Sequence, residues 1–190
     1  MRLFTAIELP ENVRARLAAI TSALRNHRDL KDALSFTRED NFHITLKFLG
    51  DVADDKVPAL ASSLQTLRVA PMNLSISHFL VLPGQGPARV LAANVAGDIK
   101  PLADLFSQIE SAGQPLGIPR EARAYKPHVT FGRFRRPSGK FTAQTLTKMI
   151  DSKQLPTPGF TATEFVLFQS DLALDGAIHS AVARFGSRSP

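Results

Sequence analysis

The sequence predicts an α+β fold with antiparallel sheet, built as two similar lobes within one compact unit. Strand-like and helix-like hydrophobic patterns mix along the chain, and most strands follow one another as hairpins. The segment His43-Ile44-Thr45-Leu46 recurs as His128-Val129-Thr130-Phe131, 85 residues later (128 − 43 = 85). A chain of 190 residues can form one well-buried core, or two small lobes that share one, but not two large domains.

In the N-terminal half, apolar residues over positions 1–10 predict a largely buried strand that ends at Pro10. Apolar residues then recur at three- and four-residue spacing over 10–27, which is typical of an amphipathic helix. Residues 41–50 alternate between apolar and polar and predict a strand. Further elements are a helix at 53–67 that opens with two aspartates, and strands at 71–82 and 88–95 around a Pro/Gly-rich turn.

In the C-terminal half, an apolar helix face predicts a helix at 98–113 that stops at Gly113. A Gly/Pro-rich link follows. The remaining predictions are a strand at 124–134, a helix at 142–150, and strands at 159–168 and 176–185 around the turn signal Leu174-Asp175-Gly176.

The composition is that of an ordinary globular protein, with 44% hydrophobic and 21% charged residues. The absence of cysteine excludes disulfides, thiolate metal sites and a cysteine nucleophile. The first ten residues lack the apolar stretch of a secretory signal, and no window is apolar enough to span a bilayer, so we expect a cytoplasmic protein. The net charge of +6 and the pI near 10.1 favour polyanions such as nucleic acid as partners.

The repeated segments predict one chemical face on each of two strands. Alternation places His43, Thr45 and Lys47 on a polar face, and Phe42, Ile44, Leu46 and Phe48 in the core. His128 and Thr130 share a face in the same way. A single strand histidine is more often a structural residue than a catalyst, but two copies with the same hydroxyl neighbour favour catalysis.

Two histidines suit phosphoryl transfer, because a pKa of about 6.5 lets one act as base and the other as acid near neutral pH. Facing each other, they could serve the attacking and the leaving oxygen at once. The threonine hydroxyls could then donate to the non-bridging oxygens. No Asp, Glu or His cluster with metal-ligand spacing accompanies either segment, so a metal-free site is expected.

The sequence resembles the LigT-like RNA 2',3'-cyclic phosphodiesterases of the two-histidine (2H) phosphoesterase superfamily nearly from end to end. The resemblance lies in RLFTAI at 2–7, NFHITLKFLGDV at 41–52, ARV at 88–90, YKPHVTFGR at 125–133 and FVLFQSDLALDGAIHSAVARF at 165–185. It implies a bilobal fold, each lobe an antiparallel sheet with outer helices, and an active site in the central groove. It also implies hydrolysis of a 2',3'-cyclic phosphate on an RNA end or nucleotide to a 2'-phosphate, without a cofactor.

The same resemblance implies roles for individual residues. His43 would be the proton donor to the leaving 3' oxygen and His128 the proton acceptor, while Thr45 and Thr130 would hold phosphate oxygens. Arg133 would be a further phosphate ligand. In a regular strand, however, Arg133 faces away from His128, so it reaches the site only if the strand ends or bulges near Gly132; the alternative is a solvated surface arginine.

Other residues have two interpretations each. Tyr125 could stack on a base or ribose, or be structural, and Phe36, where the family often has Trp, could line the groove. Lys47 could steer the anion, but a solvated lysine is favoured. We expect His179 to be structural, where the family often carries Tyr, and His27 and His78 to be surface or packing residues.

Two other functions stay open. The basic surface also suits a non-catalytic RNA- or nucleotide-binding module. Microscopic reversibility would also allow a 2'-5' RNA ligase, since the same acid and base serve both directions. We expect a monomer that acts without a cofactor and without a membrane.

Overall fold

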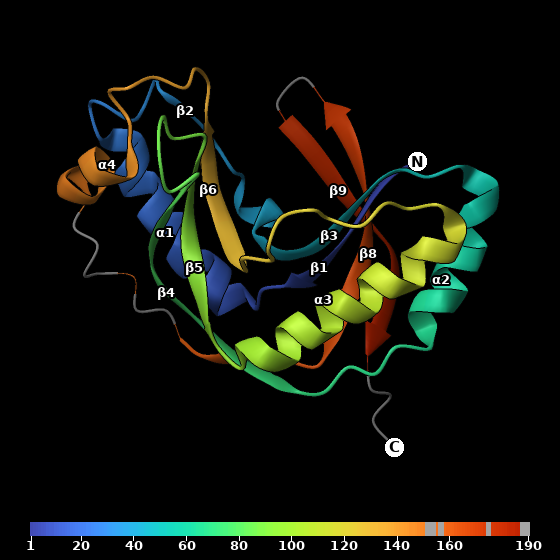
Figure 1. The fold of residues 1–190 in the computed structure, drawn as a ribbon. Helices are drawn as coiled ribbons and strands as arrows, with labels where there is room; N and C mark the ends of the chain where they lie inside the picture. The colour runs from blue at the N-terminus through green and yellow to red at the C-terminus, as the bar shows by residue number, and fades with distance from the viewer. Residues whose placement is uncertain (151–154, 156–157, 174–175, 187–190) are drawn as a thin grey trace.

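The chain folds into two antiparallel sheets flanked by helices, which confirms the α+β prediction (Figure 1). The structure is a computed structural model and describes residues 1–150, 155, 158–173 and 176–186. The strands are β1 (Arg2–Glu8), β2 (Leu34–Phe36), β3 (His43–Asp51), β4 (Met72–Leu82), β5 (Val90–Gly97), β6 (His128–Phe134), β7 (Phe160–Ala162), β8 (Glu164–Ala173) and β9 (Gly176–Gly186). The helices are α1 (Glu11–Asn26), α2 (Val57–Gln65), α3 (Ile99–Gly113) and α4 (Ala143–Met149).

The two histidine segments lie in different sheets. Sheet A has the strand order β3-β1-β8-β9, and sheet B has the order β2-β6-β5-β4-β7. Sheet A therefore combines the two ends of the chain, whereas the middle of the chain forms most of sheet B. In Figure 1, α2 and α3 lie at the sheet A end of the molecule and α1 and α4 at the sheet B end. His43 begins β3, an edge strand of sheet A, and His128 begins β6 in sheet B.

Most predicted elements are present, with differences at short segments. The predicted helix over 53–67 opens with a 3-10 turn at Asp54–Lys56 before α2. The predicted strand over 159–168 is two strands, β7 in sheet B and β8 in sheet A. Strand β2 was not predicted, because three residues are too few to show a period of two and the strand exists through its pairing with β6. The predicted turn at Leu174-Asp175 lies outside the described residues.

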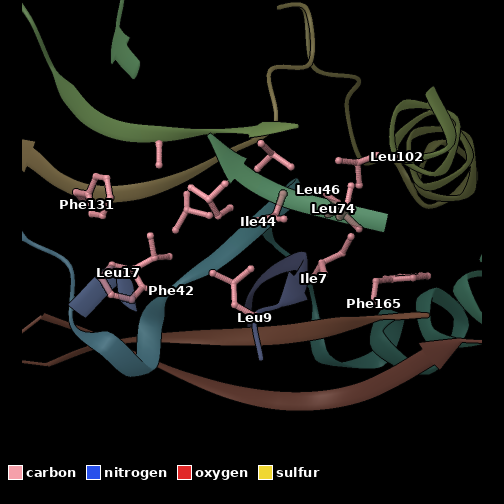
Figure 2. Close-up of a cluster of buried hydrophobic side chains, with 14 of the residues drawn as sticks. Ile7, Leu9, Leu17, Phe42, Ile44, Leu46, Leu74, Leu102, Phe131 and Phe165 are labelled. Atoms are coloured by element: carbon pink, nitrogen blue, oxygen red, sulfur yellow. The ribbon is translucent and has the colours of Figure 1, made fainter. Parts of the chain in front are cut away.

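One cluster of buried apolar side chains connects the two sheets. Figure 2 shows Ile44 and Leu46 of β3 pointing into this cluster, where Leu74 of β4 also lies. Phe42, which precedes β3, packs its ring against that of Phe131 on β6, with centroids 6.2 Å apart. The core face of each histidine strand is thus held by side chains of the other sheet. None of the described helices is long and apolar enough to cross a membrane.

The pairing of β3 with β1 contains a bulge directly after Thr45. Thr5 and Ala6 are consecutive on β1, but their partners on β3 are Lys47 and Thr45, so Leu46 is an extra residue. An extra residue of this kind reverses the alternation of faces beyond it. Lys47 and Phe48 therefore lie on the opposite faces from those that a regular strand predicts, until a further register shift at Leu49 restores the alternation.

Two expectations for β3 are wrong for this reason. Lys47 was expected on the solvated face with His43, but it is buried. Phe48 was expected in the core, but it is 60% exposed and pairs with Phe4 on the face that carries His43. The expectation from the hydrophobic pattern was wrong here because it rested on an unbroken period of two along the strand.

Lys47 forms a buried ion pair with Glu110 of α3. The Nζ–Oε1 distance is 2.6 Å, and the two side chains are only 2% and 7% exposed. Lys47 Nζ also donates to the carbonyl oxygen of Pro119, at 2.8 Å. The Glu110 carboxylate accepts the backbone N–H of Glu121, with distances of 3.3 and 3.2 Å to its two oxygens. The pair therefore fastens β3 to α3 and to the segment that leads into β6.

We expect Lys47→Met to lower the free energy of unfolding by about 3–5 kcal/mol, because it leaves the Glu110 carboxylate buried without a counter-charge. The double variant Lys47→Met/Glu110→Gln removes both charges and keeps an acceptor for the Glu121 N–H, so it should recover much of that loss. Urea denaturation of the wild type, both single variants and the double variant measures the coupling. A loss of stability in the double variant equal to the sum of the losses in the two single variants would contradict a coupled buried pair.

Candidate active site

Strand β6 carries a bulge at the same place relative to its histidine as β3 does. Leu91 and Ala92 are consecutive on β5, but their partners on β6 are Gly132 and Thr130, so Phe131 is extra. In each histidine strand the extra residue thus directly follows the threonine. The two His-x-Thr segments share a backbone irregularity as well as a sequence pattern.

This second bulge brings Arg133 to the face of His128. Arg133 pairs with Val90 and Thr130 with Ala92, and alternate residues of β5 share a face, so Arg133 lies on the same side as Thr130. The positive charge of Arg133 also lowers the pKa of His128. The irregularity near Gly132 on which the sequence-based expectation for Arg133 depended is present.

Gly132 allows β2 to approach at the bulge. A Cβ at this position would lie 2.8 Å from the carbonyl oxygen of Ser35 and 3.3 Å from the Cα of Phe36. Both are backbone atoms of β2, which pairs with β6 here. Any side chain at position 132 would therefore move either β2 or the strand that carries Arg133.

His43 is set in an aromatic environment. Its Nε2 lies 3.1 Å from Thr45 Oγ1, and its ring centroid is 5.0 Å from that of Phe4 and 5.3 Å from that of His179. Burial, together with the charges of His179 and His128, lowers the pKa of His43 to about 4, although a hydrogen bond to the backbone of Asn41 acts in the opposite direction. His43 is therefore neutral at pH 7 in the free protein.

The hydrogen bonding of His128 determines its tautomer. Its Nδ1 lies 2.7 Å from the carbonyl oxygen of Lys126. Because a carbonyl can only accept, Nδ1 carries the proton and Nε2 of the neutral ring keeps a lone pair. Burial lowers the pKa of His128, and Arg133 lowers it too, against the opposing effect of the backbone hydrogen bond. A neutral ring with a free Nε2 is the form that a general base needs.

The two histidines are held in the same way. Each bonds the backbone of the residue two positions earlier, Asn41 or Lys126, and each has a threonine two positions later. The charge of His128 lowers the pKa of His43, so the two imidazoles lie within electrostatic range of each other. The structure thus brings together the two motifs that are 85 residues apart in the sequence (128 − 43 = 85).

His179 of β9 is a third imidazole beside His43. Its ring lies 4.8 Å from that of Phe4, and its charge lowers the pKa of His43. The sequence placed it in a strand but gave no sign of this neighbour, because the contact arises from the order of strands in sheet A. His78, expected at the surface or in packing, is exposed on β4.

The structure does not bring Phe36 to the histidines, and it packs the Tyr125 ring against α3. Phe36 pairs with Gly132, opposite in face to Arg133, and packs against the core with the Arg25 guanidinium 5.3 Å from its ring centroid. The Tyr125 ring stacks on Phe106 of α3, with centroids 4.5 Å apart and an interplanar angle of 5°. Its hydroxyl donates to the carbonyl oxygen of Thr45, at 3.2 Å. Of its two interpretations, these contacts favour the structural one.

The described residues contain no group of three or more His, Cys, Asp or Glu side chains that could hold a metal ion. The site contains the imidazoles of His43 and His128. The hydroxyls of the two threonines and the exposed guanidinium of Arg133 lie on the same strand faces as these imidazoles. These groups can exchange protons and hold a phosphate anion.

The chain is similar in sequence to known phosphoesterases. Residues 7–92 match the family model described as LigT like Phosphoesterase. The chain is 27% identical over 183 residues to the RNA 2',3'-cyclic phosphodiesterase of Methanocaldococcus jannaschii, covering 96% of this chain and 98% of that protein. It is 28% identical over 195 residues to the protein of the same name from Thermus thermophilus, covering 99% and 91%.

Solved structures show the same fold. Escherichia coli LigT complexed with 3'-AMP superposes with a TM-score of 0.78 at 24% identity, covering 97% of each chain. The complex of the same protein with phosphate gives a TM-score of 0.71 at 22% identity, covering 97% of this chain and 96% of that one.

We expect Gly132→Ala to lower the free energy of unfolding by about 1–3 kcal/mol, because the new methyl group overlaps the backbone of β2. Gly139→Ala is the matched control, since a Cβ there meets nothing within 4 Å. Thermal unfolding of both variants tests this steric account. Equal melting temperatures for the two variants would show that β2 does not constrain the bulge.

The pKa of His43 predicts a pH dependence of stability. The unfolded chain protonates this histidine near pH 6.5, whereas the folded protein does so only near pH 4, so protons favour unfolding between these values. Relative to a His43→Gln variant, the wild type should lose on the order of 2 kcal/mol more stability between pH 7 and pH 4.5. Urea denaturation at both pH values measures this difference, and parallel losses in the two proteins would refute the buried, neutral state of His43.

Proposed function

Because the chain belongs to the LigT-like phosphoesterase family, we propose that it hydrolyses 2',3'-cyclic phosphate ends of RNA or nucleotides to 2'-phosphates, with His43 and His128 as acid and base. The observation that carries this proposal is the pair of His-x-Thr strands, each with an extra residue directly after its threonine, whose imidazoles lie within electrostatic range. The names of the relatives support the substrate class. The complex of E. coli LigT with 3'-AMP supports a nucleotide ligand.

In this reaction His128 is the base. Its Nε2 lone pair takes a proton from the attacking water, while the Lys126 carbonyl holds the other ring nitrogen and fixes the ring. The water oxygen forms a bond to phosphorus as the bond from phosphorus to the 3' oxygen breaks. The 2' oxygen keeps the phosphate.

His43 is the acid that gives its proton to the leaving 3' oxygen. In the free protein it is neutral, so it must gain a proton when substrate binds. A phosphate anion beside the ring raises the pKa of an imidazole and supplies this change. After turnover His43 is neutral and His128 protonated, and exchange with solvent restores the starting state.

Three further groups hold the phosphate. The hydroxyls of Thr45 and Thr130 donate to the non-bridging oxygens, and the Arg133 guanidinium stabilises the charge that grows on them. Arg133 is exposed and shares a face with Thr130, which supports this role. These donors do most when negative charge is greatest, in the transition state.

We expect His43→Ala and His128→Ala each to reduce kcat/KM for nucleoside 2',3'-cyclic phosphates by about 10²–10⁴-fold, because each removes a proton-transfer group. His78→Ala, an exposed histidine on β4, is the matched control and should keep full activity. Circular dichroism of each variant confirms that it is folded. Product analysis by chromatography should find 2'-phosphates.

Two results would contradict this proposal. Activity that EDTA abolishes and zinc restores would indicate metal chemistry rather than a histidine pair. Tight binding of cyclic phosphate ends without turnover, unchanged by either histidine substitution, would indicate a non-catalytic binding module.

A further inference from the structure

Phe48 is an exposed aromatic side chain with no place in the proposed chemistry. It lies five residues after His43, and the bulge in β3 turns it to the face of that histidine. Arg133 lies five residues after His128, beyond the matching bulge in β6. Equivalent positions of the two motifs thus present a phosphate ligand from sheet B and a phenyl ring from sheet A.

The Phe48 ring joins an aromatic surface that reaches His43. The buried Phe4 contacts both, with centroid distances of 5.9 Å to Phe48 and 5.0 Å to His43. Phe4 also stacks on Phe168, at 5.2 Å and an interplanar angle of 18°. With Ala6 and Val166, these two phenylalanines form a small apolar cluster separate from the main core. Phe48 is therefore backed by a buried apolar layer and exposed to solvent on its outer side.

Exposure of a phenyl ring is unfavourable in water, and a core position for Phe48 would need only a regular strand. Single exposed apolar residues are common and need no explanation. This ring differs because it continues the aromatic surface beside a candidate catalytic group. Every nucleobase has a flat face that stacks on such a ring, whatever its hydrogen-bonding pattern.

We propose that Phe48, supported by Phe4, stacks on the nucleobase of the terminal nucleotide whose cyclic phosphate lies between His43 and His128. This inference rests on the proposed function and names the part of the substrate that sheet A recognises. It predicts acceptance of all bases, with purines bound more tightly than pyrimidines because they offer more stacking area.

The test compares two substrates, adenosine 2',3'-cyclic phosphate and glycerol 1,2-cyclic phosphate, which has no base. Phe48→Ala should raise KM for the nucleotide about tenfold, as expected for the loss of one stacked base, and leave kinetics with the glycerol compound unchanged. Phe48→Tyr should keep the wild-type KM, and Phe48→Leu should not, although it fills a similar apolar volume. Leu172→Ala, which removes another exposed apolar side chain on β8, is the control.

An equal loss with both substrates, or wild-type behaviour of Phe48→Leu, would overturn the inference. Binding of 2'-AMP and of inorganic phosphate, measured by calorimetry, tests it without turnover. Phe48→Ala should weaken 2'-AMP binding about tenfold and leave phosphate binding unchanged, and equal affinities for 2'-AMP in variant and wild type would contradict stacking. If the wild type hydrolyses neither cyclic phosphate, the proposed function is refuted. The calorimetric result then still decides whether Phe48 stacks on the base.

Discussion

The buried ion pair of Lys47 and Glu110 is the contact on which the geometry of the candidate site depends. Lys47 follows Thr45 by two residues, and its ammonium group also holds the Pro119 carbonyl, while Glu110 holds the Glu121 N–H. A few residues later, the Tyr125 hydroxyl bonds the Thr45 carbonyl. The chain from 117 to 127 is thus fastened to the first histidine strand before it enters the second. Buried ion pairs are rarely strong net stabilisers, so the value of this one lies in fixing a single arrangement of the two strands.

The paired bulges allow each histidine strand to serve both the core and the candidate site. Each histidine strand must pack one side into the shared core and present several polar groups on the other side. A regular strand would send the residue five positions after the histidine into the core. The extra residue, Leu46 or Phe131, adds one more core side chain and turns the following positions over. The bulges therefore widen the set of side chains that can act beside each histidine.

The two histidines differ in their electrostatic surroundings, although their local backbone contacts are alike. His43 lies against rings and beside His179, and its pKa is lowered to about 4. His128 has an exposed guanidinium close by, and its backbone partner leaves Nε2 unprotonated. In the proposed mechanism, a free site in which both rings are neutral gains its acid only when an anion binds. Substrate binding itself would then set the protonation state for catalysis.

The sequence by itself determined the element types, the α+β class and the two His-x-Thr segments, because hydrophobic periodicity and a local repeat need only neighbouring residues. The resemblance also indicated Arg133, and the need for a bulge near Gly132 followed from strand parity. Only the tertiary structure decided that Lys47 is buried against Glu110, that Phe48 is exposed and that His179 lies beside His43. It also separated Phe36 from the histidines. Bulges, strand order and ion pairs between distant segments depend on which strands pair, and a period of two along one strand contains no information about its partner.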